Sequence, residues 1–270
     1  RLPPPAGAAP SELLAWLMRP PPRGAPMVEC LITRERRGLS LFPIYRMYVQ
    51  CDDGDALVVV ARRRKRADGH SFHLSTDADD LTSRGPSYVG KLRSNLVGSE
   101  WMLYDGGLNP SKLPRGSVAA AARRELGMVV CQQNVVGAAA PRRVRATLPA
   151  LDDATGAPRD VRPSSVDETL PARAKANRLL VKDHIFLASK EPKLNPATGA
   201  HSLDFKGRVT QGSVKNFQLA RTEAPDAVAC QFGKVGKHEF VLDYAWPLTP
   251  LQAFGFALTS LAYKLANEGG

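Results

Sequence analysis

The segment that begins at Tyr88 carries the residue types best suited to binding an anion. It reads Tyr88-Val89-Gly90-Lys91-Leu92-Arg93-Ser94-Asn95. In a β-strand, alternate side chains point to opposite faces, so Lys91 and Arg93 share one face while Tyr88 and Leu92 share the other. Lysine contributes a point charge and arginine a planar pair of donors, which together suit a phosphorylated headgroup. The alternative is that the pair is simply the solvated face of a strand.

A second concentration of positive charge lies upstream, in the run Arg62-Arg63-Arg64-Lys65-Arg66. The run follows an apolar strand-like segment, Leu57–Ala61, and precedes the turn signal Ala67-Asp68-Gly69. Three interpretations remain open for it. It can be a solvated hairpin tip, a nuclear localisation patch, or an auxiliary surface that attracts anions without selecting among them.

The sequence contains none of the common catalytic motifs. Gly-x-Ser-x-Gly, a phosphate-cradling glycine loop with Lys-Ser/Thr, and His-Glu-x-x-His are all missing. His70 and His73 are three residues apart, but no cysteine or acidic cluster accompanies them, so we expect no zinc site there. The other histidines, His184, His201 and His238, are isolated. We therefore expect neither an enzyme nor a bound cofactor.

The charge balance favours an acidic partner without identifying it. The chain has 270 residues, with 37 Lys+Arg against 26 Asp+Glu and a net charge of +11. Such an excess suits nucleic acid, an anionic membrane or an acidic protein, and it can also serve solubility alone. The four cysteines are widely spaced and form no Cys-x-x-Cys pair, so we expect reduced thiols in an intracellular protein. Arg1–Pro10 does not read as a signal peptide, and because the chain starts at Arg rather than Met we expect it to be part of a longer protein.

A long apolar stretch near the C-terminus predicts the element that positions the rest of the chain. No charged residue lies between Asp243 and Lys264. Thr249, Pro250 and Gln252 form the start signal of a helix, with a Thr-x-x-Gln capping box. A helix that is apolar on nearly all sides must be buried, and this one is too short for a bilayer, which takes about 20 residues. We therefore expect a central core helix.

Most of the remaining chain reads as short strands separated by turns rich in Gly, Asp and Pro. The strand-like segments include Val28–Thr33, Ile44–Cys51, Leu57–Ala61, Phe72–Leu74, Trp101–Tyr104, Met128–Asn134, Val144–Leu148, Leu179–Leu187, Val214–Leu219, Val228–Phe232 and Phe240–Tyr244. Many short strands with one apolar helix favour a closed barrel filled by that helix. Two segments do not fit this pattern: Val118–Arg124 is Ala-rich and locally favours helix, and residues 152–175 read as a long mobile loop. Residues 1–26 read as a Pro-rich linker with a short helix over Ser11–Met18.

Several long motifs, in order, resemble those of the Tubby family's C-terminal domain. They include Phe42-Pro43, Arg62–Arg66, Tyr88–Asn95, Tyr104-Asp105, Asn109-Pro110, Arg123–Leu126, Asn134–Gly137, Pro141-Arg142, Asp204–Gln218, Gln231–Lys234, Asp243-Tyr244 and Leu251–Phe254. The resemblance runs from about Arg19 to the end of the chain. It implies a mainly β fold, in which a closed antiparallel barrel of about twelve strands is threaded by a central apolar C-terminal α-helix. It further implies that residues 27–270 form the domain and that Val118–Arg124 leads into a strand, against its local preference.

The resemblance also implies a function. Proteins similar to this one bind phosphatidylinositol 4,5-bisphosphate at the plasma membrane through a basic pocket. The family's Lys-x-Arg maps onto Lys91 and Arg93, and the Arg of its Arg-x-Glu-Leu maps onto Arg123, while Arg124 matches no family role. Where the family has an asparagine, this chain has Ser71. A hydroxyl can still donate to a phosphate, but the preference among phosphoinositides is then an open question.

We therefore expect a reversible membrane tether, located in the cytoplasm and at the plasma membrane, with the nucleus or cilium as further locations. Related proteins deliver receptors to cilia through a segment upstream of the domain, or carry an upstream F-box, so protein cargo and transport machinery are further expected partners. The expected state is a monomer. A DNA-binding transcription regulator is the alternative, although no recognition helix is evident. A barrel that carries a hydrophobic ligand is a third reading, and it needs an open lumen.

Overall fold

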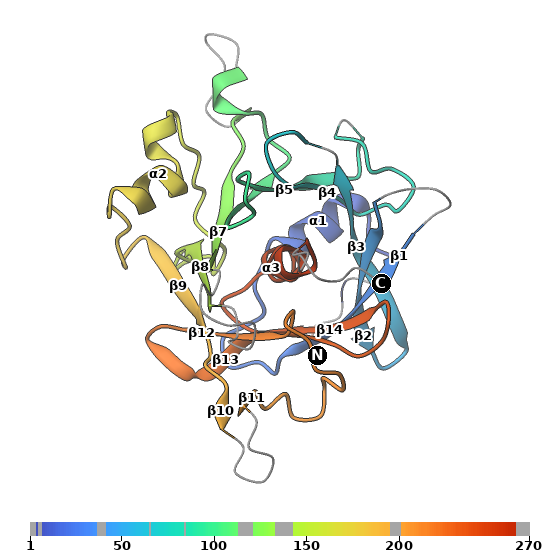
Figure 1. Cartoon of the computed structure of the whole chain (residues 1–270). Helices are drawn as coiled ribbons and strands as arrows, with labels where there is room; N and C mark the ends of the chain where they lie inside the picture. Colours follow the sequence, from blue (N-terminus) through green and yellow to red (C-terminus); the bar gives the residue numbers. More distant parts are fainter. Residues whose placement is uncertain are drawn as a thin grey trace.

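Twelve antiparallel strands close into a barrel in the computed structural model, which describes residues 4, 7–36, 42–64, 66–83, 85–112, 121–132, 143–194 and 201–262. The barrel strands are β1 (Val28–Glu35), β2 (Ile44–Cys51), β3 (Gly54–Arg64), β4 (Ser71–Ser75), β5 (Tyr88–Ser94), β6 (Glu100–Asp105), β7 (Glu125–Gln132), β8 (Arg143–Pro149), β9 (His184–Ser189), β12 (Phe217–Arg221), β13 (Ala224–Lys234) and β14 (Glu239–Tyr244). Each strand pairs with its neighbour along this series, and β1 pairs with both β2 and β14, which closes the ring (Figure 1). The expected fold is confirmed.

Helix α3 (Pro250–Ala262) runs through the middle of the barrel (Figure 1), and all thirteen of its residues are buried. The expected capping box is present. The Thr249 amide donates to Gln252 Oε1 at 2.9 Å, and the Gln252 amide donates to Thr249 Oγ1 at 3.2 Å. Gln252 Nε2 also donates to the Leu126 carbonyl at 2.8 Å, which ties the start of the helix to β7. A buried glutamine is stable here because its polar groups are bonded.

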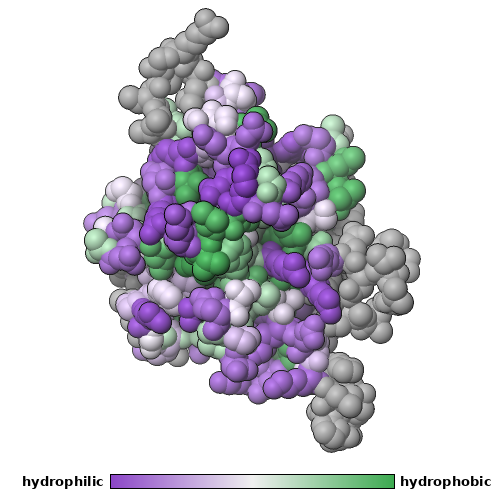
Figure 2. All heavy atoms as spheres, turned by 90° about the vertical axis from the view of Figure 1, so that its left-hand side faces the viewer, coloured by the Kyte–Doolittle hydropathy of each residue, from purple (hydrophilic) through white to green (hydrophobic). Residues whose placement is uncertain are grey.

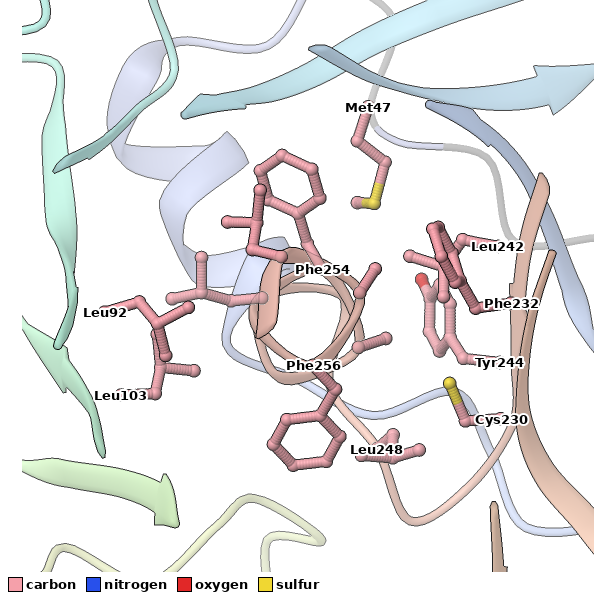
Figure 3. Packing of buried hydrophobic residues seen from close by; sticks show 14 of the residues in the cluster. Met47, Leu92, Leu103, Cys230, Phe232, Leu242, Tyr244, Leu248, Phe254 and Phe256 are labelled. Atoms are coloured by element: carbon pink, nitrogen blue, oxygen red, sulfur yellow. The ribbon is translucent and has the colours of Figure 1, made fainter. Parts of the chain in front are cut away.

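The barrel core packs around α3 from every side. Phe254 and Phe256 project from opposite sides of the helix, and Leu92 and Leu103 lie across the helix from Phe232, Leu242 and Tyr244 (Figure 3). The inward side chains of the strands therefore meet the helix rather than an open lumen. A close-packed interior of this kind resists changes in side-chain volume.

Two expectations about the segment between β8 and β9 are wrong. Residues 152–175 were expected to form a mobile loop, but they include a 3₁₀ turn, η3 (Val166–Glu168), and a short helix, α2 (Leu170–Lys175). The helix is held because Leu170 is fully buried on the outside of the barrel and its amide donates to Glu125 Oε2 at 2.7 Å. The strand expected from Leu179 begins only at His184, because residues 180–183 form a turn closed by a bond from the Asp183 amide to the Leu180 carbonyl.

The remaining elements lie outside the ring of strands or at its ends. Helix α1 (Pro10–Leu17) contacts α3 and buries Leu17 in the core. The 3₁₀ turn η1 (Pro110–Lys112) follows β6, and β10 (Lys193–Leu194) pairs with β11 (His201–Ser202). The expectation for residues 118–120 falls outside the described residues; β7 begins after Arg124, at Glu125. None of the described helices is both long and apolar enough to cross a membrane.

Candidate anion-binding site

The candidate residues lie on the outer wall of the barrel, across the neighbouring strands β3 to β6. Residues paired directly across antiparallel strands project from the same face. One such row contains Arg64, Ser71 and Arg93, and the next contains Arg62, His73, Lys91 and Tyr104. The residues between these rows, Phe72, Leu92 and Leu103, point inward and are buried in the core. Lys91 and Arg93 therefore share the outer face, as their alternation predicts.

Arg93 and Lys91 are half-buried, and their surroundings lower the pKa of both side chains. The Nε atom of Arg93 is buried and has no hydrogen-bond partner among the described residues. Burial lowers the pKa of Lys91 to about 8, and the positive charges of Arg123 and Arg93 act in the same direction. The pKa of Arg93 is also lowered, by burial and then by Arg66 and Arg123. The positive charges of these groups repel one another, and the negative charge of a bound anion would offset that repulsion.

Arg123 reaches the site from the chain that leads into β7. Its amide donates to the Leu108 carbonyl at 2.8 Å, and the Leu108 amide donates to Ala121 at 3.0 Å. Gly107 allows this close approach, because a Cβ there would lie 2.5 Å from the Cα of Arg123. The Arg123 guanidinium then lies over the ring of Tyr104, 3.8 Å from its centroid. Its Nε and Nη1 atoms are buried and unbonded to any other described residue.

The neighbouring Arg124 is occupied elsewhere. Its Nε atom donates to Asp105 Oδ2 at 2.8 Å, and its amide donates to Asp105 Oδ1 at the same distance. Asp105 Oδ1 also accepts from the Gly107 amide at 2.9 Å. The salt bridge therefore fixes the turn that presents Arg123 and neutralises Arg124. Of the two adjacent arginines, Arg123 is the one that lies beside Lys91 and Tyr104.

Ser71 lies directly opposite Arg93 in the pairing of β4 with β5, and opposite Arg64 in the pairing of β3 with β4. Only 2% of Ser71 is exposed. Its small side chain thus sits at the base of the outer face, between two guanidinium-bearing residues. Of the four residues expected to bind a headgroup, Ser71, Lys91 and Arg93 lie on the neighbouring strands β4 and β5. Arg123 stacks on Tyr104 of the next strand, β6.

Only the end of the basic run after residue 61 lies in the hairpin connection. Arg62, Arg63 and Arg64 form the last three residues of β3. Arg64 Nη2 donates to the Leu81 carbonyl at 2.6 Å, and Arg63 Nη2 lies 2.6 Å from His70 Nδ1. Beyond the strand, Arg66 Nε donates to Asp68 Oδ1 at 2.7 Å. Lys65 is outside the described residues.

Two aromatic residues lie at the site in positions that the sequence does not predict. Tyr104 supplies the ring on which Arg123 stacks, and Lys91 Nζ lies 6.0 Å from the same centroid. Tyr88 was expected on the face opposite Lys91, which is wrong. The register between β4 and β5 shifts so that Ser75 pairs with Tyr88, while Val89 is buried in the core. This bulge turns Tyr88 outward, where its ring lies 5.6 Å from that of His73.

The remaining signals from the sequence have ordinary partners. The ring of His70 stacks on Trp101 with centroids 5.6 Å apart. His184 is buried and its Nδ1 lies 2.9 Å from the Leu180 carbonyl. Across the described part of the chain, no three His, Cys, Asp or Glu residues gather as metal ligands would. The four cysteines, Cys30, Cys51, Cys131 and Cys230, are free thiols, and Cys51 is the least buried of them.

The arrangement can hold a multivalent anion. Three cations, two from β5 and one from the chain that leads into β7, meet on one outer wall, with buried N–H groups on two of them still without an acceptor among the described residues. Asp105 is paired with Arg124, and Glu125 Oε2 accepts from the Leu170 amide, while Glu125 Oε1 is buried without a partner among the described residues. Oxygens of a polyphosphate could accept from all three cations at once, as bidentate and point-charge contacts.

Comparison with known proteins places the chain in a family. The Tub family model matches residues 17–263. The chain is 38% identical over 261 residues to human Tubby-related protein 3, covering 95% of this chain and 58% of that protein. It is 35% identical over 260 residues to mouse Tubby-related protein 2, covering 94% of this chain and 45% of that protein. The chain thus spans about half of the length of these relatives, and it belongs to the Tub family.

Proposed function

We propose that this chain is a phosphoinositide-binding domain that tethers reversibly to phosphatidylinositol 4,5-bisphosphate at the plasma membrane. The observation that carries the proposal is the set of buried, unbonded N–H groups on Arg93 and Arg123, beside a lysine with a lowered pKa. Leaving such donors without acceptors costs about 1–3 kcal/mol each. Phosphate oxygens would remove that cost, so the site is poised for an anion of several charges.

In this proposal each cation has a defined role. Arg93 and Arg123 donate to phosphate oxygens, Lys91 contributes a point charge, and Ser71 adds a hydroxyl at the base of the site. Arg62, Arg64 and Arg66 raise the positive potential nearby and attract an anionic leaflet without selecting a lipid. Each cation near such a leaflet contributes about 1 kcal/mol, and the effect fades within a Debye length. One lipid therefore gives modest, salt-sensitive binding, and cleavage of the headgroup would release the protein.

The barrel suits a tether better than the alternatives do. Helix α3 is buried on all sides, so it is not available as a recognition helix for DNA. The same helix occupies the space that a hydrophobic ligand would need inside the barrel. We further propose that the longer proteins of this family engage protein cargo and transport machinery. The sites in the cell where the tether acts are a further proposal.

Sedimentation with liposomes tests the proposal. One set carries phosphatidylinositol 4,5-bisphosphate, and the other carries phosphatidylserine at the same total charge. We expect the parent chain to prefer the phosphoinositide, and the Lys91→Ala/Arg93→Ala variant to lose that preference. The matched control is Lys182→Ala/Lys237→Ala, because both residues are exposed and the variant also lowers the net charge of +11 by two.

Two outcomes would contradict the proposal. Equal binding of the parent to both liposomes would reduce Lys91 and Arg93 to a solvated strand face. Equal loss of binding in the site variant and the control variant would mean that net charge, rather than a pocket, drives association. Retardation of one specific DNA sequence at physiological salt, unchanged in the site variant, would favour the transcription-regulator alternative instead.

A further inference from the structure

The turn between β5 and β6 presents two large apolar side chains to solvent. Leu96 and Val97 are 70% and 67% exposed. They occupy the two central positions of a turn closed by a bond from the Gly98 amide to the Asn95 carbonyl at 3.2 Å. The turn follows β5 directly, so Leu96 is only three residues from Arg93 of the candidate site. Burial of these two side chains against a partner would remove apolar surface from water, which is favourable.

This turn is rigid, although its tip is exposed. Asn95 Oδ1 accepts from the amides of Ser99 and Glu100 at 3.0 and 3.2 Å, and its Nδ2 donates to Ser99 Oγ at 2.9 Å. Trp101 Nε1 donates to the Gly98 carbonyl at 2.9 Å, and Gly98 has the positive φ of 71° that the turn requires. The backbone is therefore fixed before any partner arrives. A fixed loop loses little conformational entropy when its apolar tip is buried.

The apolar tip lies beside cations of the candidate site. The β3–β4 hairpin and the β5–β6 turn lie at the same end of the barrel and touch, because a Cβ on Gly69 would lie 2.5 Å from the Asn95 carbonyl oxygen. The first hairpin carries Arg66, whose charge lowers the pKa of Arg93. An apolar tip next to cations matches the boundary of an anionic leaflet, where charged headgroups cover an apolar layer.

The distances agree with this match. A strand rises by roughly 3.3 Å per residue, so the tip extends at most about 10 Å beyond Arg93. The headgroup layer on each side of a bilayer is about 5–8 Å thick. If Arg93 holds phosphates within that layer, Leu96 and Val97 therefore reach its apolar boundary.

We propose that Leu96 and Val97 insert into the boundary between headgroups and acyl chains when the site holds its lipid. The inference rests on the proposed function, and it adds a second, apolar contact with the same membrane. It separates recognition from retention: Lys91, Arg93 and Arg123 select the headgroup, while the tip adds affinity that soluble headgroups cannot use. A free inositol phosphate would accordingly bind the cations but gain nothing from the turn.

The test replaces the tip and compares it with a second exposed apolar pair on a different segment. Leu96→Ser/Val97→Ser changes exposed side chains only. Leu180→Ser/Val181→Ser is the matched control, since these residues are 49% and 81% exposed and follow α2 at the opposite end of the barrel. Figure 2 shows the face on which α2 and β9 lie, with apolar residues gathered among hydrophilic ones. Both variants are measured with liposomes containing phosphatidylinositol 4,5-bisphosphate and by titration with soluble inositol 1,4,5-trisphosphate.

We expect the tip variant to bind these liposomes about tenfold more weakly than the control variant, because it no longer buries two apolar side chains. Its affinity for inositol 1,4,5-trisphosphate should equal that of the parent. Equal liposome affinity of the two variants would overturn the inference. So would a parallel loss of soluble headgroup binding, since the tip would then act on the site itself.

The proposed function fails in a different way from this inference. If the parent shows no preference for the phosphoinositide over phosphatidylserine, headgroup recognition is wrong. In that case the tip inserts if only the tip variant loses binding to phosphatidylserine liposomes. It does not insert if the tip variant and the control variant both bind these liposomes as the parent does. The two ideas therefore give separate readouts in the same experiment.

Discussion

The Arg123 guanidinium lies over the Tyr104 ring at 3.8 Å from its centroid, on the outer wall of the barrel. Lys91 Nζ is 6.0 Å from the same centroid. A cation that stacks on a ring face is held in place without consuming its hydrogen-bond donors, unlike one held by a carboxylate. Tyr104 therefore orients Arg123 while leaving Nε and Nη1 for a ligand, whereas Asp105 engages the Nε of Arg124.

The stacked pair predicts a contrast between two substitutions of Tyr104. Tyr104→Phe keeps the ring face, so affinity for liposomes with phosphatidylinositol 4,5-bisphosphate should change less than twofold. Tyr104→Leu removes the ring and should weaken binding about threefold to tenfold, since a partly buried cation–π contact contributes about 0.5–2 kcal/mol. Equal affinities for the two variants would show that the ring does not orient Arg123. Thermal unfolding of both variants checks that the barrel is intact.

Lys91 predicts a pH dependence of binding. Its pKa is lowered to about 8 in the free site, chiefly by burial. A bound anion favours the charged form, so binding takes up a proton above pH 8 and affinity should fall as pH rises from 7 to 9. Lys91→Arg keeps its charge throughout and should show a smaller fall. The comparison also cancels titration of the lipid, because both proteins meet the same phosphates; parallel pH profiles would contradict the prediction.

The lowered pKa of Lys91 also predicts that this residue destabilises the folded chain. Between pH 8 and the ordinary lysine pKa of 10.5, the unfolded chain binds more protons at this position than the folded chain. The contribution of Lys91 to the free energy of unfolding is therefore unfavourable below pH 8 and improves as pH rises through this window. Lys91→Met should raise the thermal midpoint at pH 7, by about 2–4 °C for each kcal/mol relieved. A lower midpoint would mean that Lys91 stabilises the fold; liposome binding should be lost in either case.

Glu125 links the site to α2 and predicts a second pH effect. The residue is buried, and burial raises its pKa to about 6, against the effects of the Leu170 amide and Arg123. The folded chain holds the proton more tightly between pH 4.5 and 6, so this carboxyl destabilises the fold increasingly as pH rises through 6. Glu125→Gln keeps an oxygen for the Leu170 amide and removes the charge.

The difference in thermal midpoint between Glu125→Gln and the parent should therefore shift in favour of the variant from pH 5 to pH 7.5. The exposed Glu223→Gln serves as a control for the loss of one surface charge. A constant difference across that range would show that Glu125 does not titrate within it.

Much of the fold follows from the sequence, because its signals are local. The capping residues and the uncharged stretch predict α3, and the turns predict most strands. The site is harder to predict, because it depends on contacts across the barrel. Val89 is accommodated in a bulge that turns Tyr88 outward, and no alternation rule shows this. The position of Arg123 depends on the close approach of Gly107, and the position of Leu170 depends on Glu125, an acceptor distant in the sequence.

Ser71 provides the last prediction, because the resemblance to the family implies an asparagine at this position. The serine lies opposite Arg93 at the base of the site and offers one hydroxyl. An asparagine would offer an amide donor and an oxygen, and a further bond to a charged phosphate adds affinity. Ser71→Asn should therefore bind phosphatidylinositol 4,5-bisphosphate liposomes about threefold to tenfold more tightly, and Ser71→Ala more weakly than the parent.

The gain of Ser71→Asn should be selective, since one added donor favours one arrangement of phosphates. Liposomes with phosphatidylinositol 3,4-bisphosphate, at equal charge, measure that preference against the 4,5-isomer. We expect the ratio of the two affinities to rise in Ser71→Asn and to be near one in Ser71→Ala. If all three proteins bind both isomers alike, Ser71 does not touch the headgroup, and selection depends on the three cations alone.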